Sequence, residues 1–370
     1  MKIRRSAILL LFVVSFLSSV RIGHAAPQWE PAKTWVFFVS LVKWKDSDSF
    51  ESFPEENRKD IVFLDTLRKR GVTDDHIAYL KDSAATTAAV ERRFDEFLRK
   101  PGPDDWVLVY FSGHGYKNDD GVSYLATYDV DDERDGWRFD AVPAAIDRYF
   151  RGSHAIIALD ACFSGAMAND VKRVKRRVSY AVFASSLASQ ESTSDWTFTE
   201  ALISAFGGAP FVDQNHDGHI TFDEMGRNAV EDMLFGEEQM ATIAYTGNFD
   251  SQAVVADSTP PASPRIGERV EAYSQDGWYK GYIADIRADQ YRIHYYGYDD
   301  SEDEWVTTRS IRSPKVVHYV IGEKVDVQWK KQWYPATVLR VKASSQLVKY
   351  AVYGNERNEW VSSARIRRRT

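Results

Sequence analysis

Two side chains of this sequence have the chemistry of a nucleophile and a base. Cys162 is the single cysteine among 370 residues and lies in IIALDACFSGAM, residues 156–167. His114 lies in WVLVYFSGHGY, residues 106–116. A thiolate is a nucleophile, and a nearby imidazole both favours it and can protonate a leaving amine. An unpaired cysteine in an exported chain indicates an intermolecular disulfide or a reactive thiol, and the histidine favours the second.

Each of these residues follows an apolar run that has the character of a buried strand, residues 106–111 and 155–160. In a doubly wound sheet, functional groups collect beyond the carboxyl ends of the strands. If the two strands are neighbours, His114 and Cys162 therefore face one another above the sheet. Ser112, Gly113 and Gly115 allow the backbone to turn tightly, so amide groups near Gly115 and Cys162 can point at a developing oxyanion.

Other parts of the first 255 residues supply the elements that would position this pair. Apolar runs alternate with helical patterns, which is typical of a mainly parallel sheet covered on both faces. An α/β domain is therefore expected over residues 31–255. The segments that predict it are a strand at 34–42 and helices at 58–71, 88–100 and 141–150.

The pair YFSGHG and DACFSG, with His114 and Cys162 separated by 48 positions, resembles the caspase–metacaspase superfamily of cysteine peptidases (peptidase C14 type). The resemblance covers roughly residues 33–250, including VFASSLASQESTSDWTFTEALISAF as a further strand and helix. It implies a caspase-like three-layer sandwich, His114 and Cys162 as a catalytic dyad, and the Gly115 and Cys162 amides as an oxyanion hole. Two alternatives stay open: Cys162 is a small buried hydrophobe beside a turn histidine, or the domain is degenerate and keeps only the motifs.

Asp160, two residues before the cysteine, bears on specificity. The resemblance implies a metacaspase-like site here, because caspases that cut after aspartate carry glutamine at this position. A carboxylate in the pocket attracts a guanidinium or ammonium group, so cleavage after Arg or Lys is expected, with Ser112 as a second substrate-binding residue. Phe163 departs from the histidine typical of metacaspases. The alternative is that Asp160 is a strand-end or helix-cap carboxylate.

A basic run, VKRVKRRVSY at residues 171–180, follows the cysteine closely. In the family this region joins the large and small parts, where self-cleavage occurs. A peptidase that prefers basic residues would find its own cleavage sites here, although an ordinary solvated basic loop fits the run equally well. The candidates are Lys172, Arg173, Lys175, Arg176 and Arg177.

A calcium-binding loop is predicted at DQNHDGHITFDE, residues 213–224, which has the twelve-residue EF-hand pattern. Hard oxygen ligands at this spacing suit Ca²⁺, and a lone loop of this kind should bind weakly. A vestigial acidic turn is the alternative. His216 and His219 do not predict zinc, because no cysteine is available and the loop is acidic; no organic cofactor is expected. The expected ligands are Asp213, Asn215, Asp217, His219 through its carbonyl, Thr221 through water, and Glu224.

After a proline-rich linker, ADSTPPASPR at 256–265, the chain contains an internal repeat with a constant offset of 55 residues. Short strands rich in aromatic residues and separated by turns predict two small SH3-like β-barrels, over 266–312 and 318–369. The repeats resemble the Tudor-knot or chromo-barrel class, related to the agenet group, whose aromatics can form a cage around a methylated cation. Core packing is the alternative for each aromatic. The candidates are Trp278, Tyr295, Tyr298 and Trp305, with Trp333, Tyr350, Tyr353 and Trp360.

Charge and the N-terminal segment complete the sequence-based picture. Residues 1–25 have the basic, apolar and small-residue order of a cleaved secretory signal, and no second long apolar run follows, so a secreted or periplasmic protein without a membrane span is expected. The net charge of −7 argues against a nucleic-acid partner for the peptidase domain. Residues 313–370 carry 12 bases and 4 acids, so an unidentified ligand or an anionic surface is expected for the barrels.

These features predict a secreted cysteine endopeptidase that acts on polypeptides. The competing hypothesis is a non-catalytic scaffold whose barrels bind a ligand.

Overall fold

The computed structural model describes residues 28–56, 58–131, 135–174, 178–314, 317–329, 332–342, 345–354 and 358–369. The predicted signal peptide at 1–25 lies outside these residues and stays a prediction. Within the described parts of the chain, none of the helices has the length and apolar character needed to cross a membrane.

A six-stranded sheet with the order β10-β8-β7-β3-β1-β2 forms the centre of the first domain. All neighbouring pairs are parallel except β10 with β8. Its middle strands are buried almost throughout, as apolar runs must be in a parallel sheet covered on both faces. The strands are β1 (Thr34–Ser40), β2 (Ile77–Lys81), β3 (Trp106–Ser112), β7 (His154–Asp160), β8 (Ser179–Ala184) and β10 (Thr242–Thr246).

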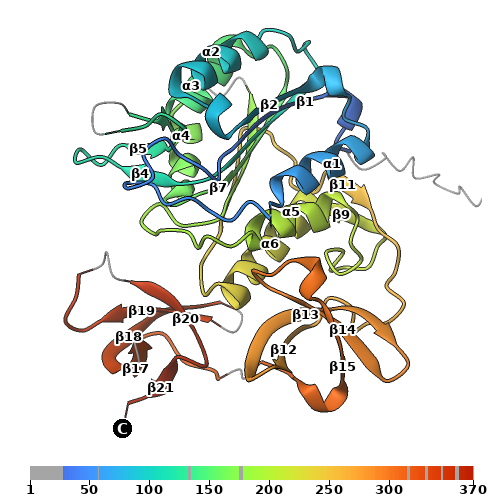
Figure 1. The fold of residues 1–370 in the computed structure, drawn as a ribbon, viewed down its shortest axis with the longest axis vertical. Helices are drawn as coiled ribbons and strands as arrows, with labels where there is room; N and C mark the ends of the chain where they lie inside the picture. The colour runs from blue at the N-terminus through green and yellow to red at the C-terminus, as the bar shows by residue number, and fades with distance from the viewer. Residues whose placement is uncertain are drawn as a thin grey trace, which may run out of the picture.

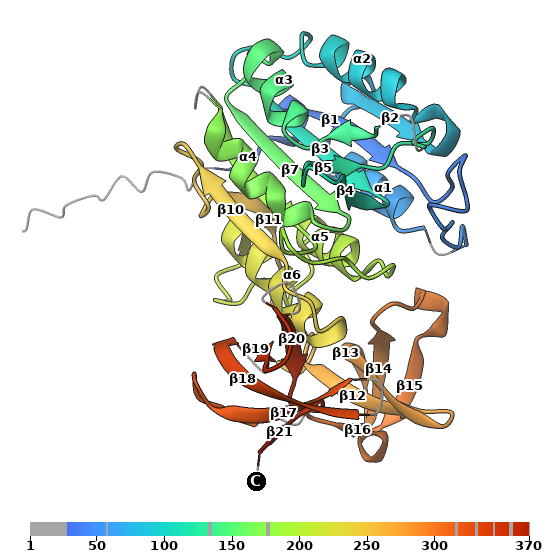
Figure 2. The same cartoon turned by 90° about the vertical axis from the view of Figure 1, so that its left-hand side faces the viewer.

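Helices cover both faces of this sheet (Figures 1 and 2). Alternate residues of β1 enter two separate cores: Phe38 packs with the first group of helices and Phe37 with the second. The predicted three-layer α/β sandwich is therefore confirmed. The first group contains α1 (Asp60–Arg70), α5 (Thr197–Phe206) and α6 (Phe222–Gly236); the second contains α2 (Thr87–Phe97), α3 (Ala141–Tyr149) and α4 (Met167–Arg173).

Several short elements were not expected from the sequence. A three-stranded sheet consists of β4 (Gly115–Lys117), β5 (Ser123–Leu125) and β6 (Trp137–Arg138), and β9 (His219–Thr221) pairs with β11 (Val254–Asp257). Strand β11 extends two residues into the stretch predicted as linker, residues 256–265. Single 3₁₀ turns occur at Pro31–Lys33, Asp74–His76, Asp82–Ala84, Ser164–Ala166, Asp300–Glu302 and Thr308–Ser310.

The C-terminal repeats form two curled antiparallel five-stranded sheets of the same topology, so the two predicted SH3-like barrels are confirmed. Each has a β-bulge at the equivalent place, between Ile283 and Asp285 in one and between Val338 and Arg340 in the other. Barrel 1 contains β12 (Arg269–Ser274), β13 (Gly277–Arg287), β14 (Gln290–Tyr295), β15 (Glu304–Thr307) and β16 (Ile311–Arg312). Barrel 2 contains β17 (Lys324–Trp329), β18 (Gln332–Lys342), β19 (Ser345–Tyr350), β20 (Glu359–Ser362) and β21 (Ile366–Arg368).

Both barrels pack against the α/β domain beside α6, on the side of the sheet that carries α5 (Figure 1).

Candidate active site

The strands β3 and β7 are parallel neighbours, and Ser112 pairs with Asp160 at their carboxyl ends. The Gly113 amide donates a hydrogen bond to the Asp160 carbonyl over 3.1 Å, which extends the pairing into the loops. His114 and Cys162 therefore emerge at the same edge of the sheet. Both line a cavity of about 600 Å³, together with Ser112, Gly115 and Asp160.

Gly115 lies directly against the backbone of the cysteine loop. A Cβ atom at this position would come within 2.2 Å of the Cys162 carbonyl oxygen, so only glycine allows the close approach. The Gly115 backbone also lies near enough to the Cys162 thiol to lower its pKa. The two residues predicted as an oxyanion hole are thus adjacent at one wall of the cavity.

The His114 imidazole is held by one hydrogen bond and three aromatic rings. Its Nε2 lies 2.8 Å from the Glu51 carbonyl oxygen. A carbonyl only accepts, so Nε2 carries the hydrogen and Nδ1 is left as the basic nitrogen. Ring centroids of Trp44 and Phe53 lie 4.5 Å from the imidazole, and that of Phe50 lies at 5.7 Å. Burial lowers the pKa of His114, against a smaller opposite effect of Glu51.

The Cys162 thiol is covered by a segment that no sequence pattern indicated, residues 190–196. The Ser192 amide donates to Sγ over 3.2 Å, and the Phe163 amide donates to the Gln190 carbonyl over 2.8 Å. Burial raises the pKa of the thiol, while backbone hydrogen bonds from Ser192 and Gly115 act in the opposite direction. Among the described residues, no hydrogen bond joins Sγ to His114. A catalytic contact that is loose without substrate often tightens when substrate binds.

Asp160, the last residue of β7, lines the cavity and is 9 % exposed. Its carboxylate accepts a hydrogen bond of 2.7 Å from the Thr199 hydroxyl, which lies 2.7 Å from the Tyr110 hydroxyl. Burial raises the pKa of Asp160 to about 6. Ser112 is buried, and its hydroxyl lies 2.6 Å from that of Ser40, so it already has a hydrogen-bond partner within the sheet.

Three further acidic residues line the cavity: Glu51, Glu191 and Asp195. They come from loops without periodic pattern, and nothing in the sequence connects them with Asp160. Burial raises the pKa of Asp195. The cavity wall therefore contains more carboxyl groups than the motifs predicted.

The self-cleavage candidates are only partly visible. Lys172 and Arg173 lie at the end of α4 and not in a loop, which corrects the expectation for them. Both are exposed, and Arg173 forms an ion pair of 3.1 Å with Asp170. A peptidase requires an extended backbone, so cleavage at either residue requires α4 to unwind at its end. Lys175, Arg176 and Arg177 lie outside the described residues.

The predicted calcium loop is sharply bent at Gly218, whose φ is +89°. Asp213 is 3 % exposed, and its carboxylate accepts the amides of Asp217 and Gly218 over 3.2 and 3.0 Å. Thr221 and Glu224 form a capping box at the start of α6. The Asn215 side-chain oxygen accepts the Asp217 amide over 2.8 Å.

The buried carboxylates of Asp213 and Glu224 form no ion pair among the described residues, and the donor set consists of oxygens, so the residues fit a hard cation. The capping box gives Thr221 and Glu224 a structural role at the start of α6 that does not need calcium. The presence of these two residues is therefore weaker evidence for calcium binding than the sequence pattern indicated. The His219 ring is not directed at the loop: its Nδ1 lies 3.2 Å from Asp257.

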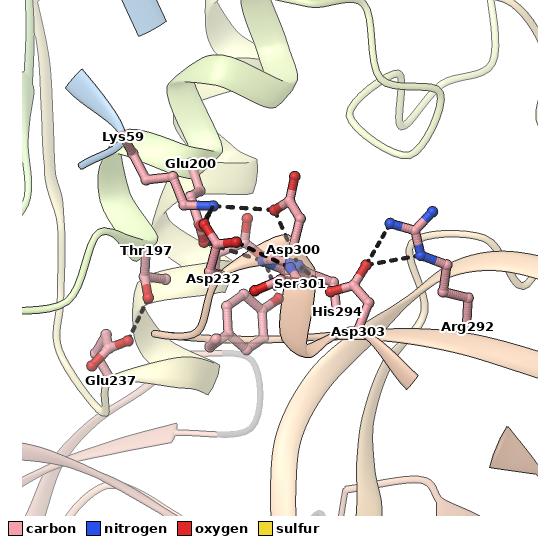
Figure 3. Close-up of polar contacts among 12 residues, drawn as sticks. Lys59, Thr197, Glu200, Asp232, Glu237, Arg292, His294, Asp300, Ser301 and Asp303 are labelled. Atoms are coloured by element: carbon pink, nitrogen blue, oxygen red, sulfur yellow. Dashed lines mark hydrogen bonds and ion pairs between the residues drawn. The ribbon is translucent and has the colours of Figure 1, made fainter. Parts of the chain in front are cut away.

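A different cluster brings three ligand-type side chains within 4.8 Å in the described structure: Glu200, His294 and Asp300 (Figure 3). Lys59 Nζ lies 3.0 Å from Glu200 and 3.1 Å from Asp300. His294 Nδ1 lies 2.9 Å from Asp303 and Nε2 lies 3.4 Å from Glu200. Because Lys59 already supplies the cation and both imidazole nitrogens have partners, the cluster is an ion-pair network between α5 and barrel 1.

The barrel aromatics do not assemble into the predicted four-residue sets. Trp278 and Trp333 are exposed, and each has an arginine of its own barrel 4.0 Å from the ring centroid, Arg312 and Arg367. Tyr295 and Tyr350 are buried in their barrels, whereas Tyr298 and Tyr353 are exposed beside them. Trp305 is exposed next to Arg287, but Trp360 is 4 % exposed and lies in the core that contains α5 and α6.

This fold and this cavity define a caspase-like α/β domain with two appended SH3-like sheets. Residues 59–261 match the caspase domain family (peptidase C14), and the chain belongs to that family. Residues 267–316 and 322–370 each match the agenet domain.

The chain is also similar to a crystal structure of a protein from Geobacter sulfurreducens, with 13% identity and a TM-score of 0.44 over 61% of this chain and 99% of that one. Among curated proteins, none matches this chain.

Proposed function

We propose that this protein is a secreted or periplasmic cysteine endopeptidase that cleaves polypeptides after Arg or Lys. The observation that carries the proposal is the cavity at the ends of β3 and β7, which His114 and Cys162 both line beside a glycine that permits close backbone approach. Export through residues 1–25 is part of the proposal.

In the proposed reaction, His114 Nδ1 takes the proton from Sγ, and the thiolate attacks the scissile carbonyl carbon. The oxyanion receives hydrogen bonds from the Gly115 and Cys162 amides. The imidazolium then protonates the leaving amine as the C–N bond breaks and a thioester forms. Water, deprotonated by the same imidazole, hydrolyses the thioester and returns the thiol. The Glu51 carbonyl keeps Nε2 protonated throughout, so that Nδ1 does the proton transfer.

The acidic cavity wall supports a basic residue in the substrate. Asp160 and Asp195 both line the cavity, and a guanidinium ion pairs well with carboxylates in a partly desolvated site. With the pKa of Asp160 raised to about 6, its charge is present above that pH and is lost below it. Turnover of Arg substrates should therefore fall as the pH decreases through about 6.

Calcium and self-processing are secondary parts of the proposal. Asp213, Asn215, Asp217 and Glu224 would hold Ca²⁺, which would add fixed positive charge to the loop before α6 and take no part in the bond cleavage. Self-cleavage at 172–177 would follow from the same preference for basic residues.

The test uses the mature protein and Cys162→Ala on peptides that end in Arg, Lys, Asp or Asn, with calcium and with chelator. We expect turnover of the Arg and Lys peptides only, none by Cys162→Ala, and a higher calcium requirement in Glu224→Gln. Turnover confined to Asp peptides would refute the assignment of Asp160. If purified enzyme cuts basic peptides but stays one chain, self-processing is wrong.

The second candidate is a non-catalytic scaffold, favoured by the Ser192 segment over the thiol and by the missing contact between Sγ and His114. Absence of turnover on all four peptides, with retained binding of an anionic surface by the barrels, would select it.

A further inference from the structure

Three consecutive residues after α6 connect the cavity with both barrels. Gln239 is hydrogen bonded to residues 190–196, the cavity segment, and Glu237 is hydrogen bonded to Thr197 directly after it. Glu238, between them, is bonded to the barrels.

Gln239 holds the part of the cavity segment that contacts the thiol. Its Oε1 accepts the Thr193 amide over 3.0 Å, and its Nε2 donates to the Ser185 carbonyl over 2.7 Å and to the Ser192 hydroxyl over 3.0 Å. Gln239 is 7 % exposed, so these bonds are shielded from water. Because the Ser192 amide donates to Cys162 Sγ, the position of Gln239 determines whether that donor reaches the sulfur.

Glu237 holds the residue that directly follows the cavity segment. It accepts a hydrogen bond of 2.5 Å from Thr197, seen in Figure 3, and its carboxyl group is close enough to that of Asp195 for each to shift the pKa of the other. Asp195 lines the cavity, and Gly297 of barrel 1 packs on its carboxyl group: a Cβ there would lie 3.1 Å from Cγ. A shift of Glu237 would therefore move an acidic group of the cavity wall.

Glu238 is the point where both barrels act on this turn. Lys280 of barrel 1 lies 3.2 Å from its carboxylate, and Ser362 and Arg365 of barrel 2 donate to it over 2.6 and 2.7 Å. Burial alone would raise the pKa of Glu238, but these three groups outweigh it and the pKa is lowered. The carboxylate is thus held charged by residues from two separate domains.

The backbone of Glu238 is in a conformation that such a residue adopts only under constraint. Its φ is +53°, in the left-handed region where a side chain with a Cβ is disfavoured and glycine is not. Bonds from the two barrels offset this cost. Without them, the backbone would relax towards negative φ and rotate both neighbours, Glu237 and Gln239, away from the cavity segment.

We propose that Glu238 is a positioning residue through which the two barrels fix the Ser192–Asp195 wall of the Cys162 cavity. This proposal rests on the proposed peptidase function of the cavity. It makes the barrels part of the active site's geometry, in addition to any ligand that they bind.

The test compares Glu238→Ala with Glu238→Gly in the full chain. Both variants lose the bonds to the barrels, but glycine keeps the left-handed backbone without strain. The matched control is Glu231→Ala, which removes another α6–barrel ion pair, 2.9 Å from Arg269, without touching the cavity segment. The readouts are the rate of Cys162 alkylation by iodoacetamide as a function of pH, and kcat and KM on an Arg peptide.

For Glu238→Ala we expect alkylation at pH 7 to slow about tenfold and its pH midpoint to rise, because Sγ loses a hydrogen bond that favours the thiolate. KM should increase as Asp195 moves. Glu238→Gly should recover most of the wild-type rate, and Glu231→Ala should stay within about twofold of it. Glu238→Gln, which keeps the size of the side chain, should be intermediate and replaces the alanine variant if that does not fold.

The proposal would be overturned if Cys162 of the Glu238→Ala variant were alkylated at the wild-type rate. Equal slowing of alkylation in the alanine and glycine variants would also overturn it. If no protein turns over peptides but the alkylation rates follow the expected order, the peptidase function is wrong and the positioning role of Glu238 stands.

Discussion

The two barrels have the same topology and the same offset of 55 residues, yet they contact the peptidase domain in different ways. Barrel 1 contributes several ion pairs beside aromatic packing of Tyr282 on Phe211 and of Tyr296 on Phe235. Arg269 lies 2.9 Å from Glu231 and 2.8 Å from Asp232, and buried His294 approaches Glu200. Barrel 2 has the ion pair of Arg365 with Glu238, and in addition it inserts Trp360 into the core beside α5 and α6. A repeated sequence thus reproduces a fold without reproducing its interface.

Equivalent positions show how small the underlying changes are. Arg269 corresponds to Lys324, which is exposed, and Trp360 corresponds to Trp305, which is 37 % exposed. Each pair has similar chemistry but opposite environments. The environment therefore decides what each residue contributes, and paired substitutions can measure the difference.

The largest effect is expected for the tryptophan pair. Trp360→Ala should lower the free energy of unfolding by about 3–5 kcal/mol, because it leaves a cavity in a closed core. Trp305→Ala should cost less than about 1 kcal/mol, because the residue is partly in water. Denaturant unfolding of the full chain, followed by fluorescence and circular dichroism, measures both. Equal losses would show that barrel 2 is not anchored by its tryptophan.

The second largest loss of stability is expected for the equivalent residues Arg269 and Lys324. Arg269→Ala leaves the carboxylates of Glu231 and Asp232 without their cation and should cost about 3 kcal/mol. Lys324→Ala removes an exposed charge and should cost less than about 0.5 kcal/mol. Thermal unfolding, with proteolysis of residues 258–265 as a probe of barrel release, distinguishes them. An Arg269→Ala protein that resists proteolysis like the wild type would contradict docking by charge.

The histidine prediction depends on pH. Burial alone would lower the pKa of His294, but its contacts with Asp303 and Glu200 raise it to about 9. A raised folded-state pKa gives stability that is fully present below the ordinary value near 6.5 and is lost as the pH rises through about 9. His294→Gln should therefore cost about 2 kcal/mol at pH 7 and much less at pH 9.5.

The control is Lys349→Gln, the equivalent exposed residue of barrel 2. Stability curves from pH 6 to 10 give the comparison. Parallel curves for the wild type and His294→Gln would mean that the imidazole does not change its charge in this window.

The smallest loss of stability is expected for the exposed tryptophans Trp278 and Trp333, and it should be equal in the two barrels. Trp278 and Trp333 stack on Arg312 and Arg367 at the same 4.0 Å, so replacement of either tryptophan by alanine should cost about 0.5–1 kcal/mol. Thermal unfolding of the two variants measures this. A clear excess in one of them would show that the repeats differ inside the barrels as well as at their interfaces.

The sequence was a good guide where the signal is local. Apolar runs predicted β1, β3 and β7 and the helices between them, because periodicity along the chain directly reflects which face of an element is buried. The internal repeat with an offset of 55 residues predicted both barrels, because each repeat unit forms one structural unit. The edge strands β2 and β10 and the sheet of β4, β5 and β6 were missed. These are short strands whose partners, not their own pattern, determine them.

What the sequence by itself determined is the order of the elements and the two motif residues, His114 and Cys162, since both follow from short stretches with a fixed covalent spacing. Only the tertiary structure decided that Ser192 covers the thiol, that Glu238 joins two barrels to the cavity, and that Trp360 is buried where Trp305 is not. These contacts join residues from about 30 to more than 120 positions apart, and they depend on how complete surfaces fit together, which a local pattern does not encode.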